Sequence, residues 1–444
     1  MSECIKRVLV VGGGAAGMMA ALAAAEQGAE VIILEKNEKL GKKLFITGKG
    51  RCNLTNACDF DTFLCNIVSN PRFLYSAYSA CSNWDVYARV EAAGCPLKIE
   101  RGERVFPVSD HSSDVIHAFQ KMLEKAGVSV HLFTEVRSIR MRNTDDTHKP
   151  AVQVEAFQTK TKKSMHFLAD AVVICTGGKS YAATGSTGDG YRFARSFDLA
   201  VTKPVPALVP LTVEKPDCAP LSGVSLKNIA VQLYPMEEQE NGNFLVGEKP
   251  VYEAFGEMLF THTGVSGPVI LSASSVIAKA LAAGNHFQLS IDLKPALSME
   301  KLDERLLRDF ANAQNKNMEN ALEKLLLSAL RPYVLSQAGI LPQKKVHDIS
   351  KAERNALLHA IKGLQFEVNG TRGFPEAIIT QGGISVRELN PKTMEVKKIP
   401  GLYFAGEVLD IDAFTGGFNL QLAFSSGYAA GLAAGAPSEE AKRG

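Results

Sequence analysis

The sequence predicts an α/β fold with a parallel β-sheet. Segments with a different pattern of apolar and polar residues are inserted in the chain between the strands of this sheet. An apolar strand, Val8 to Val11, leads through a glycine-rich turn into an alanine-rich helix expected at Ala15 to Gln27. A second apolar strand, Glu30 to Leu34, follows after a short turn, which is typical of a β-α-β unit. Further strands are expected at Ala171 to Cys175 and Leu402 to Ala405, which is compatible with a sheet assembled from distant parts of the chain.

The N-terminal apolar run also has the length of a membrane span or a secretory signal. No residue from Val8 to Ala25 is charged, and Lys6 and Arg7 precede the run. Glycines crowd its middle, however, and each lowers the stability of a helix by about 1 kcal/mol relative to alanine. Three of its first four residues are valines, which suit a buried strand. We therefore expect a strand, a turn and a helix here, and no stable membrane association.

The bulk composition is that of a soluble globular protein. A chain of 444 residues is expected to form two or three domains, and its hydrophobic and charged contents of 46% and 22% are ordinary. The formal net charge of +2 gives no general attraction to nucleic acid. The eight cysteines show neither a CxxC pair nor the spacing of metal ligands, so we expect free thiols, a cytoplasmic protein and no metal site. The sequence does not indicate the oligomeric state.

The turn after the first strand predicts a dinucleotide site. In the spacing Gly12-x-Gly14-x-x-Gly17, the first glycine permits the tight turn, the second lets the backbone approach a pyrophosphate, and the third lets the helix pack on the sheet. The helix then directs its unpaired N–H groups and positive dipole end at the phosphates. Glu35 ends the second strand, where a carboxylate accepts ribose hydroxyls and repels a 2′-phosphate. The expected contacts are Gly12, Gly14, Ala15, Ala16, Gly17 and Glu35.

A long loop rich in glycine and lysine is expected after the second strand. Six basic residues and one acid lie between Lys36 and Arg51. Its backbone amides, with Lys43 and Arg51, are suited to a second phosphate or to the flavin end of FAD. Most of these lysines, taken singly, are expected to be solvated.

Three further segments resemble FAD-dependent oxidoreductases. Val136 follows a short strand, at the place where such proteins contact adenine through the backbone. Thr176-Gly177-Gly178 ends a strand, and Gly406-Glu407 ends another. Gly416-Gly417-Phe418-Asn419 then leads into a helix whose N-terminus is expected to face the flavin pyrimidine and to stabilise negative charge on reduced flavin.

Six blocks in order extend the resemblance over nearly the whole chain: GGGAAG (12–17), KLFITGKGRCNLTN (43–56), ERVFPVSDHSSDV (103–115), TGGKSYAATGSTGDG (176–190), FTHTGVSGP (260–268) and GGFNLQLAFSSG (416–427). The chain resembles the aminoacetone oxidase family of FAD flavoproteins, which also holds the 3-dehydro-bile-acid Δ4,6-reductase. Two positions depart from the expected pattern: Lys49 replaces a common glycine, and Glu407 replaces the Asp of flavoproteins at large.

The resemblance implies a two-dinucleotide-binding-type FAD Rossmann domain, formed by residues 1–195 and 365–444. It also implies an inserted β-barrel-like domain at 196–296 and 341–364, and a small helical subdomain at 297–340. The sequence is compatible with both insertions, because short strands with polar turns follow Lys203 and apolar residues recur at helical spacing after Ser298, a plausible N-cap. Pro332 is expected to disrupt or kink the second of these helices. The further cofactor contacts implied are Lys36, Lys43, Thr47, Gly48, Gly50, Arg51, Cys52, Asn53, Leu54, Val136, Thr176, Gly177, Gly178, Gly406, Glu407, Phe418, Asn419 and Leu420.

These observations predict an FAD-dependent oxidoreductase that transfers hydride between flavin N5 and a small organic substrate. We favour NAD(P)H-supported reduction of a conjugated C=C, as in a 3-oxo bile acid. An amine oxidase that acts on aminoacetone with oxygen is the alternative, and an FAD-containing RNA-modifying protein or a non-catalytic flavin-binding module lies outside that class. The catalytic proton donor stays unassigned, with His262 and Tyr181 as candidates. Cys52, beside Arg51, has the setting for a lowered thiol pKa, but a second cysteine at redox spacing is missing.

Overall fold

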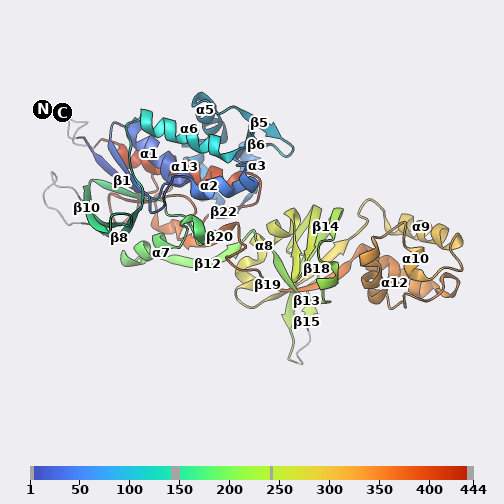
Figure 1. Cartoon of the computed structure of the whole chain (residues 1–444). Coiled ribbons are helices and arrows are strands. Elements are labelled where there is room, and N and C mark those ends of the chain that lie inside the picture. The colour runs from blue at the N-terminus through green and yellow to red at the C-terminus, as the bar shows by residue number, and fades with distance from the viewer. Residues whose placement is uncertain (1–4, 142–150, 241–243, 438–444) are drawn as a thin grey trace. The chain divides into compact units, whose positions relative to one another are not determined.

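The computed structural model describes residues 5–141, 151–240 and 244–437 (Figure 1). The chain folds into two compact units. The first unit comprises Met1–Pro206 and Ala377–Gly444, and the second unit comprises Ala207–Glu376. The inserted segment therefore leaves the first unit after Pro206 and returns to it at Ala377. The finer division into a β domain and a helical subdomain stays a prediction.

A five-stranded parallel sheet forms the centre of the first unit, with the strand order β21-β11-β1-β2-β7. Within it, Val8 of β1 lies between Val31 of β2 and Ala171 of β11. Apolar side chains cover both of its faces, which explains why the strands read as nearly continuous apolar runs. The predicted α/β class and parallel sheet are confirmed. The strands are β1 (Arg7–Val11), β2 (Glu30–Leu34), β7 (Ser129–His131), β11 (Ala171–Ile174) and β21 (Leu402–Phe404).

The N-terminal apolar run forms strand β1, a glycine turn and helix α1 (Ala15–Glu26), as predicted. Helix α1 is buried over most of its length because it packs against strands β1 and β2 and against helix α13 (Phe418–Gly435). In the part of the chain that the structure describes, no helix has both the length and the apolar character needed to cross a membrane.

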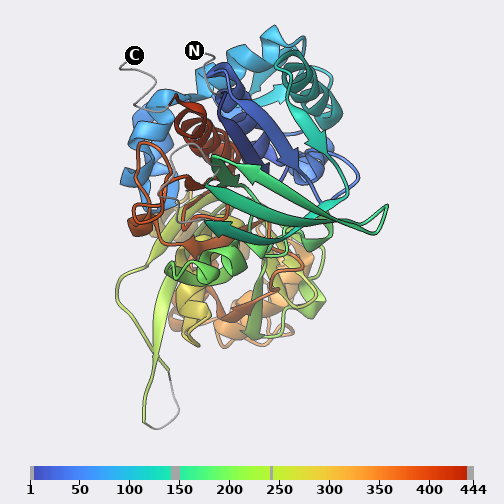
Figure 2. The same ribbon diagram turned by 90° about the vertical axis from the view of Figure 1, so that its left-hand side faces the viewer.

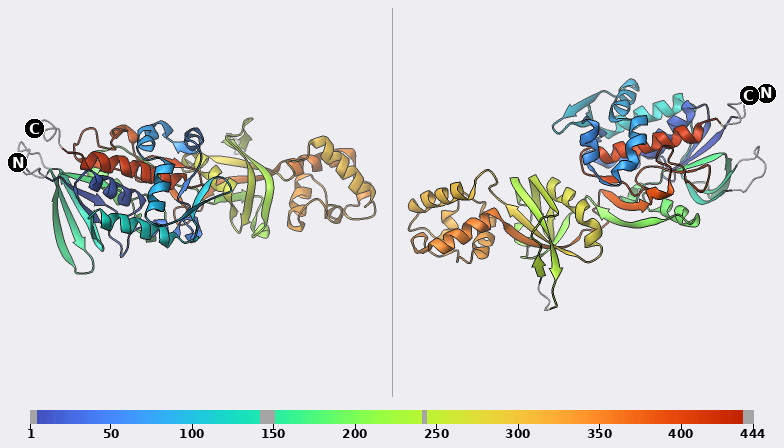
Figure 3. Two further views of the ribbon diagram at one scale, coloured as in Figure 1. Left: turned by 90° about the horizontal axis from the view of Figure 1, so that it is seen from above. Right: turned by 180° about the vertical axis from the view of Figure 1, so that it is seen from behind.

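Helices α1 and α13 pack in parallel at very close range, and Figure 3 shows the red α13 alongside the dark-blue α1. A Cβ atom added at Gly427 would lie 2.3 Å from the carbonyl oxygen of Ala16. One turn on, a Cβ at Gly431 would lie 2.1 Å from the oxygen of Ala20. Gly427 and Gly431 form a glycine stripe on the face of α13 that contacts α1. Glycine is required along this stripe, because any side chain would push the two helices apart.

An antiparallel sheet of β8 (Thr134–Met141), β9 (Val152–Gln158) and β10 (Lys163–Ala169) follows β7 in the chain. In Figure 2 these green strands run across the blue strands of the parallel sheet. The other elements of the first unit are α2 (Lys42–Ile46), β3 (Thr55–Asn56), α3 (Phe60–Cys65), β4 (Ile67–Ser69), α4 (Tyr75–Ala80), α5 (Asn83–Ala92), β5 (Leu97–Glu100), β6 (Arg104–Pro107), α6 (Ser112–Lys125), α7 (Asp189–Ser196), β12 (Val201–Ala207), β20 (Ile379–Ile384) and β22 (Asp412–Ala413).

The second unit contains an antiparallel sheet with the strand order β15-β14-β16-β17-β13-β19-β18. A further pairing between β14 and β18 closes this sheet on itself, which pairs the outer edge of β18 and leaves β15 beside β14 as an edge strand. Helix α8 (Pro268–Leu281) packs against β16. The strands are β13 (Leu211–Lys215), β14 (Ser225–Glu238), β15 (Phe244–Val246), β16 (Tyr252–Thr261), β17 (Gly264–Ser266), β18 (His286–Asp292) and β19 (Leu364–Thr371).

The helices of the second unit begin at α9 (Met299–Ala311), where the Ser298 hydroxyl accepts a hydrogen bond from the Lys301 amide, as expected of an N-cap. The expected second long helix is broken into α10 (Met318–Ala321) and α11 (Arg331–Gln337). Pro332 lies in the first turn of α11 and starts that helix rather than kinking a longer one, because a first-turn residue needs no amide hydrogen. Helix α12 (Lys351–Lys362) was missed, although Ser350 and Glu353 form a capping box that signals its start.

Candidate functional site

The glycine turn between β1 and α1 leaves one of its positions open. Gly12 has a φ of 102°, and a Cβ there would lie 2.5 Å from the carbonyl oxygen of Cys175. A Cβ at Gly17 would lie 1.8 Å from the oxygen of Gly12, so this glycine is required for packing. No atom lies within 4 Å of a Cβ built at Gly14. The turn therefore presents open backbone at the position expected to receive a diphosphate.

No side chain caps the N-terminus of α1, and Gly14 is its N-cap residue. The amide groups of Ala15 and Ala16 lie in the first helical turn, where no carbonyl of the helix can accept from them. These groups and the positive end of the helix dipole favour an anion beside Gly14. The open glycine and the uncapped helix together fit the diphosphate of a dinucleotide.

Glu35 is buried immediately after β2, and its carboxylate is fixed beside the glycine turn. One oxygen accepts a hydrogen bond from the Gly13 amide at 2.7 Å. The other oxygen accepts from the Asn37 amide and from the Asn37 side chain, both at 2.7 Å. The carboxylate therefore keeps one orientation, with lone pairs left for hydroxyl donors such as those of a ribose.

The neighbours of Glu35 come from distant parts of the first unit. Lys36 forms an ion pair with Asp189 at 2.6 Å, which joins the end of β2 to the start of α7. The carbonyl of Glu35 accepts a hydrogen bond from the Thr134 amide, and Val136 lies two residues further along β8. The structure thus places Lys36 and Val136 near the carboxylate that was predicted to bind ribose.

A second cluster joins the segments that follow β2, β11 and β21. The ammonium group of Lys43 forms an ion pair with Glu407 and donates to the Ser180 hydroxyl at 2.8 Å. Glu407 also accepts from the Ser180 hydroxyl and from the Thr380 amide, both at 2.9 Å. Because these segments lie at the carboxyl ends of parallel strands, they meet at one edge of the sheet. Neither Ser180 nor Thr380 was predicted to belong to the site, although Ser180 lies in the block TGGKSYAATGSTGDG that carries the resemblance.

Gly406 and Thr176–Gly178 pack closely beside this cluster. A Cβ at Gly406 would lie 2.7 Å from the Cβ of Ala16, so the end of β21 lies against the first turn of α1. A Cβ at Gly178 would lie 2.4 Å from the Thr380 hydroxyl. The Thr176 hydroxyl is buried and has no hydrogen-bond partner among the described residues. A buried hydroxyl without a partner is typical of a site that receives a polar ligand.

The long loop rich in glycine and lysine that the sequence predicts after β2 contains a short helix and a turn, and the segment from Thr47 to Leu54 is its last part. It follows helix α2 directly, and a short 3₁₀ turn covers Thr47–Gly50. Gly48, Lys49, Gly50 and Cys52 all have positive φ values, between 57° and 86°. Within this turn the Arg51 amide donates to the carbonyl of Gly48, and the Cys52 amide donates to the carbonyl of Thr47. The glycines at 48 and 50 permit this conformation, and a Cβ at Gly50 would meet no atom within 4 Å.

Arg51 and Cys52 have other surroundings than the sequence suggested. The guanidinium group of Arg51 lies between Glu100 and Asp110, each at 2.5 Å, and over the ring of Phe106. Hydrogen bonds to these two carboxylates raise the pKa of Arg51. The Cys52 thiol is fully buried, and desolvation raises its pKa to about 12. The suggested lowering of the Cys52 pKa is therefore wrong, because burial outweighs the neighbouring arginine.

The residues at the start of α13 hold that helix in place. The Asn53 side chain lies 3.0 Å from the Gly417 amide, and a Cβ at Gly417 would lie 2.3 Å from the carbonyl oxygen of Thr55. The side-chain amide of Asn419 donates hydrogen bonds to the carbonyls of Ala413 and Phe414, and its oxygen accepts one from the Ala413 amide. Leu54 and Phe418 are buried, and Leu420 is half-buried. Among the described residues, no side-chain hydrogen bond caps the first turn of α13, and the positive end of its dipole favours an anion there.

The N-termini of α1 and α13 are offset along the direction that the two parallel helices share. Helix α13 begins nine residues before Gly427, the residue that contacts Ala16 in the first turn of α1. Because α1 begins one residue before Ala16, the offset between the two helix starts is eight residues, or about 12 Å along the common axis at a rise of 1.5 Å per residue. Two positive helix ends at this separation fit an extended ligand that carries a diphosphate at one point and a second electron-rich group further on. FAD has this form.

The two candidate proton donors lie in different units. Tyr181 belongs to the first unit and follows the Ser180 that Lys43 contacts. Its φ of 55° is unusual for a bulky residue, and burial raises the pKa of its hydroxyl. His262 is exposed in the turn between β16 and β17 of the second unit. A role for either residue stays a prediction, as do the individual cofactor contacts.

Comparison with known proteins identifies the family. A family model described as the HI0933-like protein Rossmann domain matches residues 6–433. A 3-dehydro-bile acid Δ(4,6)-reductase of Clostridium scindens is 30% identical over 91% of this chain and 93% of its own. These findings confirm the family resemblance, the FAD-binding Rossmann fold and the class of FAD-dependent oxidoreductase.

Two other relatives carry a different name. Ribosomal RNA dihydrouridine synthases of Escherichia coli and Haemophilus influenzae are 30% and 29% identical over 95% and 91% of this chain, and over 96% and 92% of their own. A solved 3-ketosteroid-Δ4-(5α)-dehydrogenase of Rhodococcus jostii covers 98% of both chains, at 15% identity and a TM-score of 0.48. Similarity at that level is too low to bear on substrate.

Proposed function

The chain belongs to the HI0933-like family, and from this premise we propose that it reduces a C=C bond conjugated to a carbonyl group. The two kinds of relative share this chemistry, although their substrates differ. A reductase of 3-dehydro bile acids saturates bonds conjugated to a 3-oxo group, and formation of dihydrouridine saturates a bond conjugated to a carbonyl of uracil. Bound FAD supplies the hydride when it is reduced.

The observation that supports this proposal is the pair of open helix ends beside a fixed carboxylate. The N-terminus of α1 and the open backbone at Gly14 hold the diphosphate, and Glu35 accepts ribose hydroxyls. The open end of α13 favours negative charge, as develops on a flavin pyrimidine during reduction. Lys43, held by Glu407 and Ser180, fixes an ammonium group at the same edge of the sheet, where the Glu407 carboxylate balances its charge.

We propose NAD(P)H as the source of electrons. The structure shows one glycine fingerprint after a parallel strand, in β1–α1, within the residues that it describes. The nicotinamide nucleotide is therefore expected to bind transiently at the flavin and to leave before the substrate arrives. Separate reductive and oxidative half-reactions follow from this order.

A 3-oxo steroid-like acid is the substrate class that we favour, and a uracil base in RNA is the second candidate, which the two dihydrouridine synthases support. Charge favours the first class, because the formal net charge of the whole chain is only +2 and residues 207–376 carry 17 Lys and Arg against 19 Asp and Glu, so the chain has no large excess of positive charge to attract RNA. Proteins that bind RNA through its phosphates usually show a basic face.

The oxidative half-reaction tests the proposal. The holoprotein is reduced under anaerobic conditions and mixed with a 3-oxo-Δ4,6 bile acid, with the corresponding saturated 3-oxo acid, or with unmodified ribosomal RNA. We expect the oxidised flavin spectrum to return with the unsaturated acid alone, and the product to gain two hydrogens by mass spectrometry. Reoxidation by RNA with formation of dihydrouridine would establish the second candidate. Reoxidation by oxygen only, with flavin reduction by aminoacetone, would establish an amine oxidase and overturn the proposal.

A further inference from the structure

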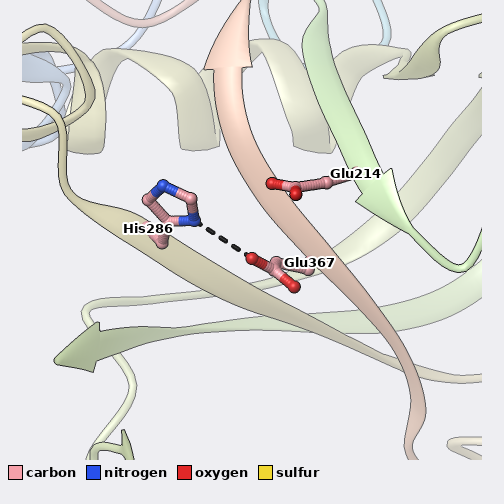
Figure 4. Close-up of side chains that lie close together, drawn as sticks. All are labelled: Glu214, His286 and Glu367. Carbon is pink, nitrogen blue, oxygen red and sulfur yellow. Dashed lines mark hydrogen bonds and ion pairs between the residues drawn. The ribbon is translucent and has the colours of Figure 1, made fainter. Parts of the chain in front are cut away.

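The second unit gathers three potential metal ligands from three strands. They are Glu214 of β13, His286 of β18 and Glu367 of β19 (Figure 4). Their ligand atoms all lie within 4.8 Å of one another, and His286 Nδ1 lies 3.0 Å from a carboxylate oxygen of Glu367. Within the described ranges, no other group of three His, Cys, Asp or Glu side chains is arranged in this way. The predicted cofactor residues all belong to the first unit.

The strand register explains why these side chains converge. Phe287 of β18 pairs with Val368 of β19, and both are buried, so His286 and Glu367 point to the opposite, outer face. Between β13 and β19, the register shifts from Val213 opposite Val368 to Lys215 opposite Glu367. Glu214 is the extra residue of this bulge. Bulges redirect side chains, and here the bulge brings a third ligand onto the outer face.

The charge of the cluster favours a cation. The two carboxylates lie within 4.8 Å of each other, where like charges repel. Within the residues that the structure describes, neither carboxylate forms an ion pair with Lys or Arg, and His286 is the one ionisable partner. A divalent cation removes the repulsion and uses the imidazole nitrogen as a ligand.

Neighbouring groups fix the orientation of two of the three ligands. The ring of Phe244 stacks on the imidazole of His286, with centroids 4.7 Å apart and planes inclined by 19°. The Asn369 amide donates to Glu214 at 3.0 Å, and Asn369 in turn accepts from the Thr212 hydroxyl at 2.9 Å. Metal ligands are usually held by such outer hydrogen bonds, which reduce the entropy lost on binding.

We propose that Glu214, His286 and Glu367 form a binding site for Zn²⁺. One imidazole nitrogen and two carboxylate oxygens are ligands that Zn²⁺ accepts in tetrahedral geometry, with a water in the fourth position. Mg²⁺ prefers oxygen ligands alone and octahedral geometry. The ion joins β13, β18 and β19, so its binding stabilises this side of the closed sheet.

Isothermal titration of the full-length holoprotein with ZnCl₂ tests the site, in metal-free buffer and without a polyhistidine tag. We expect the unmodified protein to bind one Zn²⁺ per chain. The Zn²⁺ affinity of H286Q and of E214Q should be about 100-fold lower, since even changes to residues that only support a ligand lower metal affinity about 10–100-fold. N369A, which removes the hydrogen bond to Glu214, should lose about tenfold. E253Q, at an exposed acid on β16, is the matched control and should bind as the unmodified protein does.

Thermal unfolding without metal shows whether each variant is folded. Glu214 is exposed, so we expect the E214Q variant to fold. If H286Q does not fold, the comparison with E214Q is sufficient to test the site. Equal Zn²⁺ stoichiometry and affinity in the unmodified protein and E214Q would overturn the proposal. Competition by a tenfold excess of Mg²⁺ would overturn the assignment to Zn²⁺.

Discussion

Lys43 and Glu407 lie 364 positions apart in the sequence and form an ion pair, with 2.5 Å between Nζ and the carboxylate oxygen. Each side chain is 21% exposed, so solvent screens the pair only in part. This contact ties the segment after β2 to the segment after β21, and both residues are among the predicted cofactor contacts. The pair is therefore expected to hold the rim of the FAD site together.

A double-mutant cycle with K43M and E407Q tests this role. We expect each single variant to weaken FAD binding, because each leaves an unpaired partner in a half-buried position. The double variant should recover part of the loss, with a coupling energy of about 0.5–3 kcal/mol in the free energy of FAD binding. The measurement is flavin fluorescence on titration of apoprotein. Strictly additive losses would show that the two side chains act independently.

Gly14 and Gly17 are expected to respond differently to alanine. A Cβ at Gly14 meets no atom within 4 Å, so G14A should leave the melting temperature of the apoprotein unchanged while it weakens FAD binding by blocking the approach of the diphosphate. A Cβ at Gly17 overlaps the Gly12 oxygen, so G17A should destabilise the apoprotein itself. Calorimetry of the apoproteins and FAD titration separate the two effects. Normal FAD affinity in G14A would contradict the placement of the diphosphate.

The glycine stripe of α13 sets the distance to α1. G431A should lower the free energy of unfolding by about 1–3 kcal/mol, because the added methyl group overlaps the carbonyl of Ala20 and moves the helices apart. A433S, at a half-buried position of the same helix, is the control and should change it by less than about 0.5 kcal/mol. Urea denaturation measures both. A stable G431A would indicate that the helices pack less closely than the structure shows.

The reactivity of two cysteines should differ with pH. Burial raises the pKa of Cys52 to about 12, so at pH 8 roughly one thiol in ten thousand is ionised. Cys65 is exposed. At pH 8, iodoacetamide should label Cys65 and leave Cys52 unlabelled, and the labelling rate of Cys52 should rise about tenfold per pH unit while the fold persists. Peptide mass spectrometry reads both sites, and urea-unfolded protein provides the fully labelled control. Rapid labelling of native Cys52 would contradict its burial.

The strand, glycine turn and helix at the N-terminus could be predicted because the information is local. Val8 to Val11, the glycine spacing and Glu35 lie within about thirty residues, and each has its own physical signal. The parallel sheet and the family resemblance rest on the same kind of short pattern. Ser298 was found for this reason too, since an N-cap needs only its own helix.

The surroundings of individual side chains could not be predicted, because they depend on distant residues. Arg51 is held by Glu100 and Asp110, which lie 49 and 59 positions away. Cys52 is buried by tertiary packing, so its neighbour in sequence gave the wrong direction for its pKa. Glu214 and His286 meet only through a register shift that no local pattern encodes. Helix α12, in contrast, had a local signal in its capping box.

The FAD content of the purified protein tests the central claim most directly, namely that the turn after β1 holds a diphosphate at the open end of α1. After denaturation, the released flavin is identified by chromatography and counted against protein. We predict one FAD per chain in the unmodified protein and a marked loss in G14A at unchanged stability. Protein that is colourless, and that still binds no FAD after incubation with an excess, would contradict this claim.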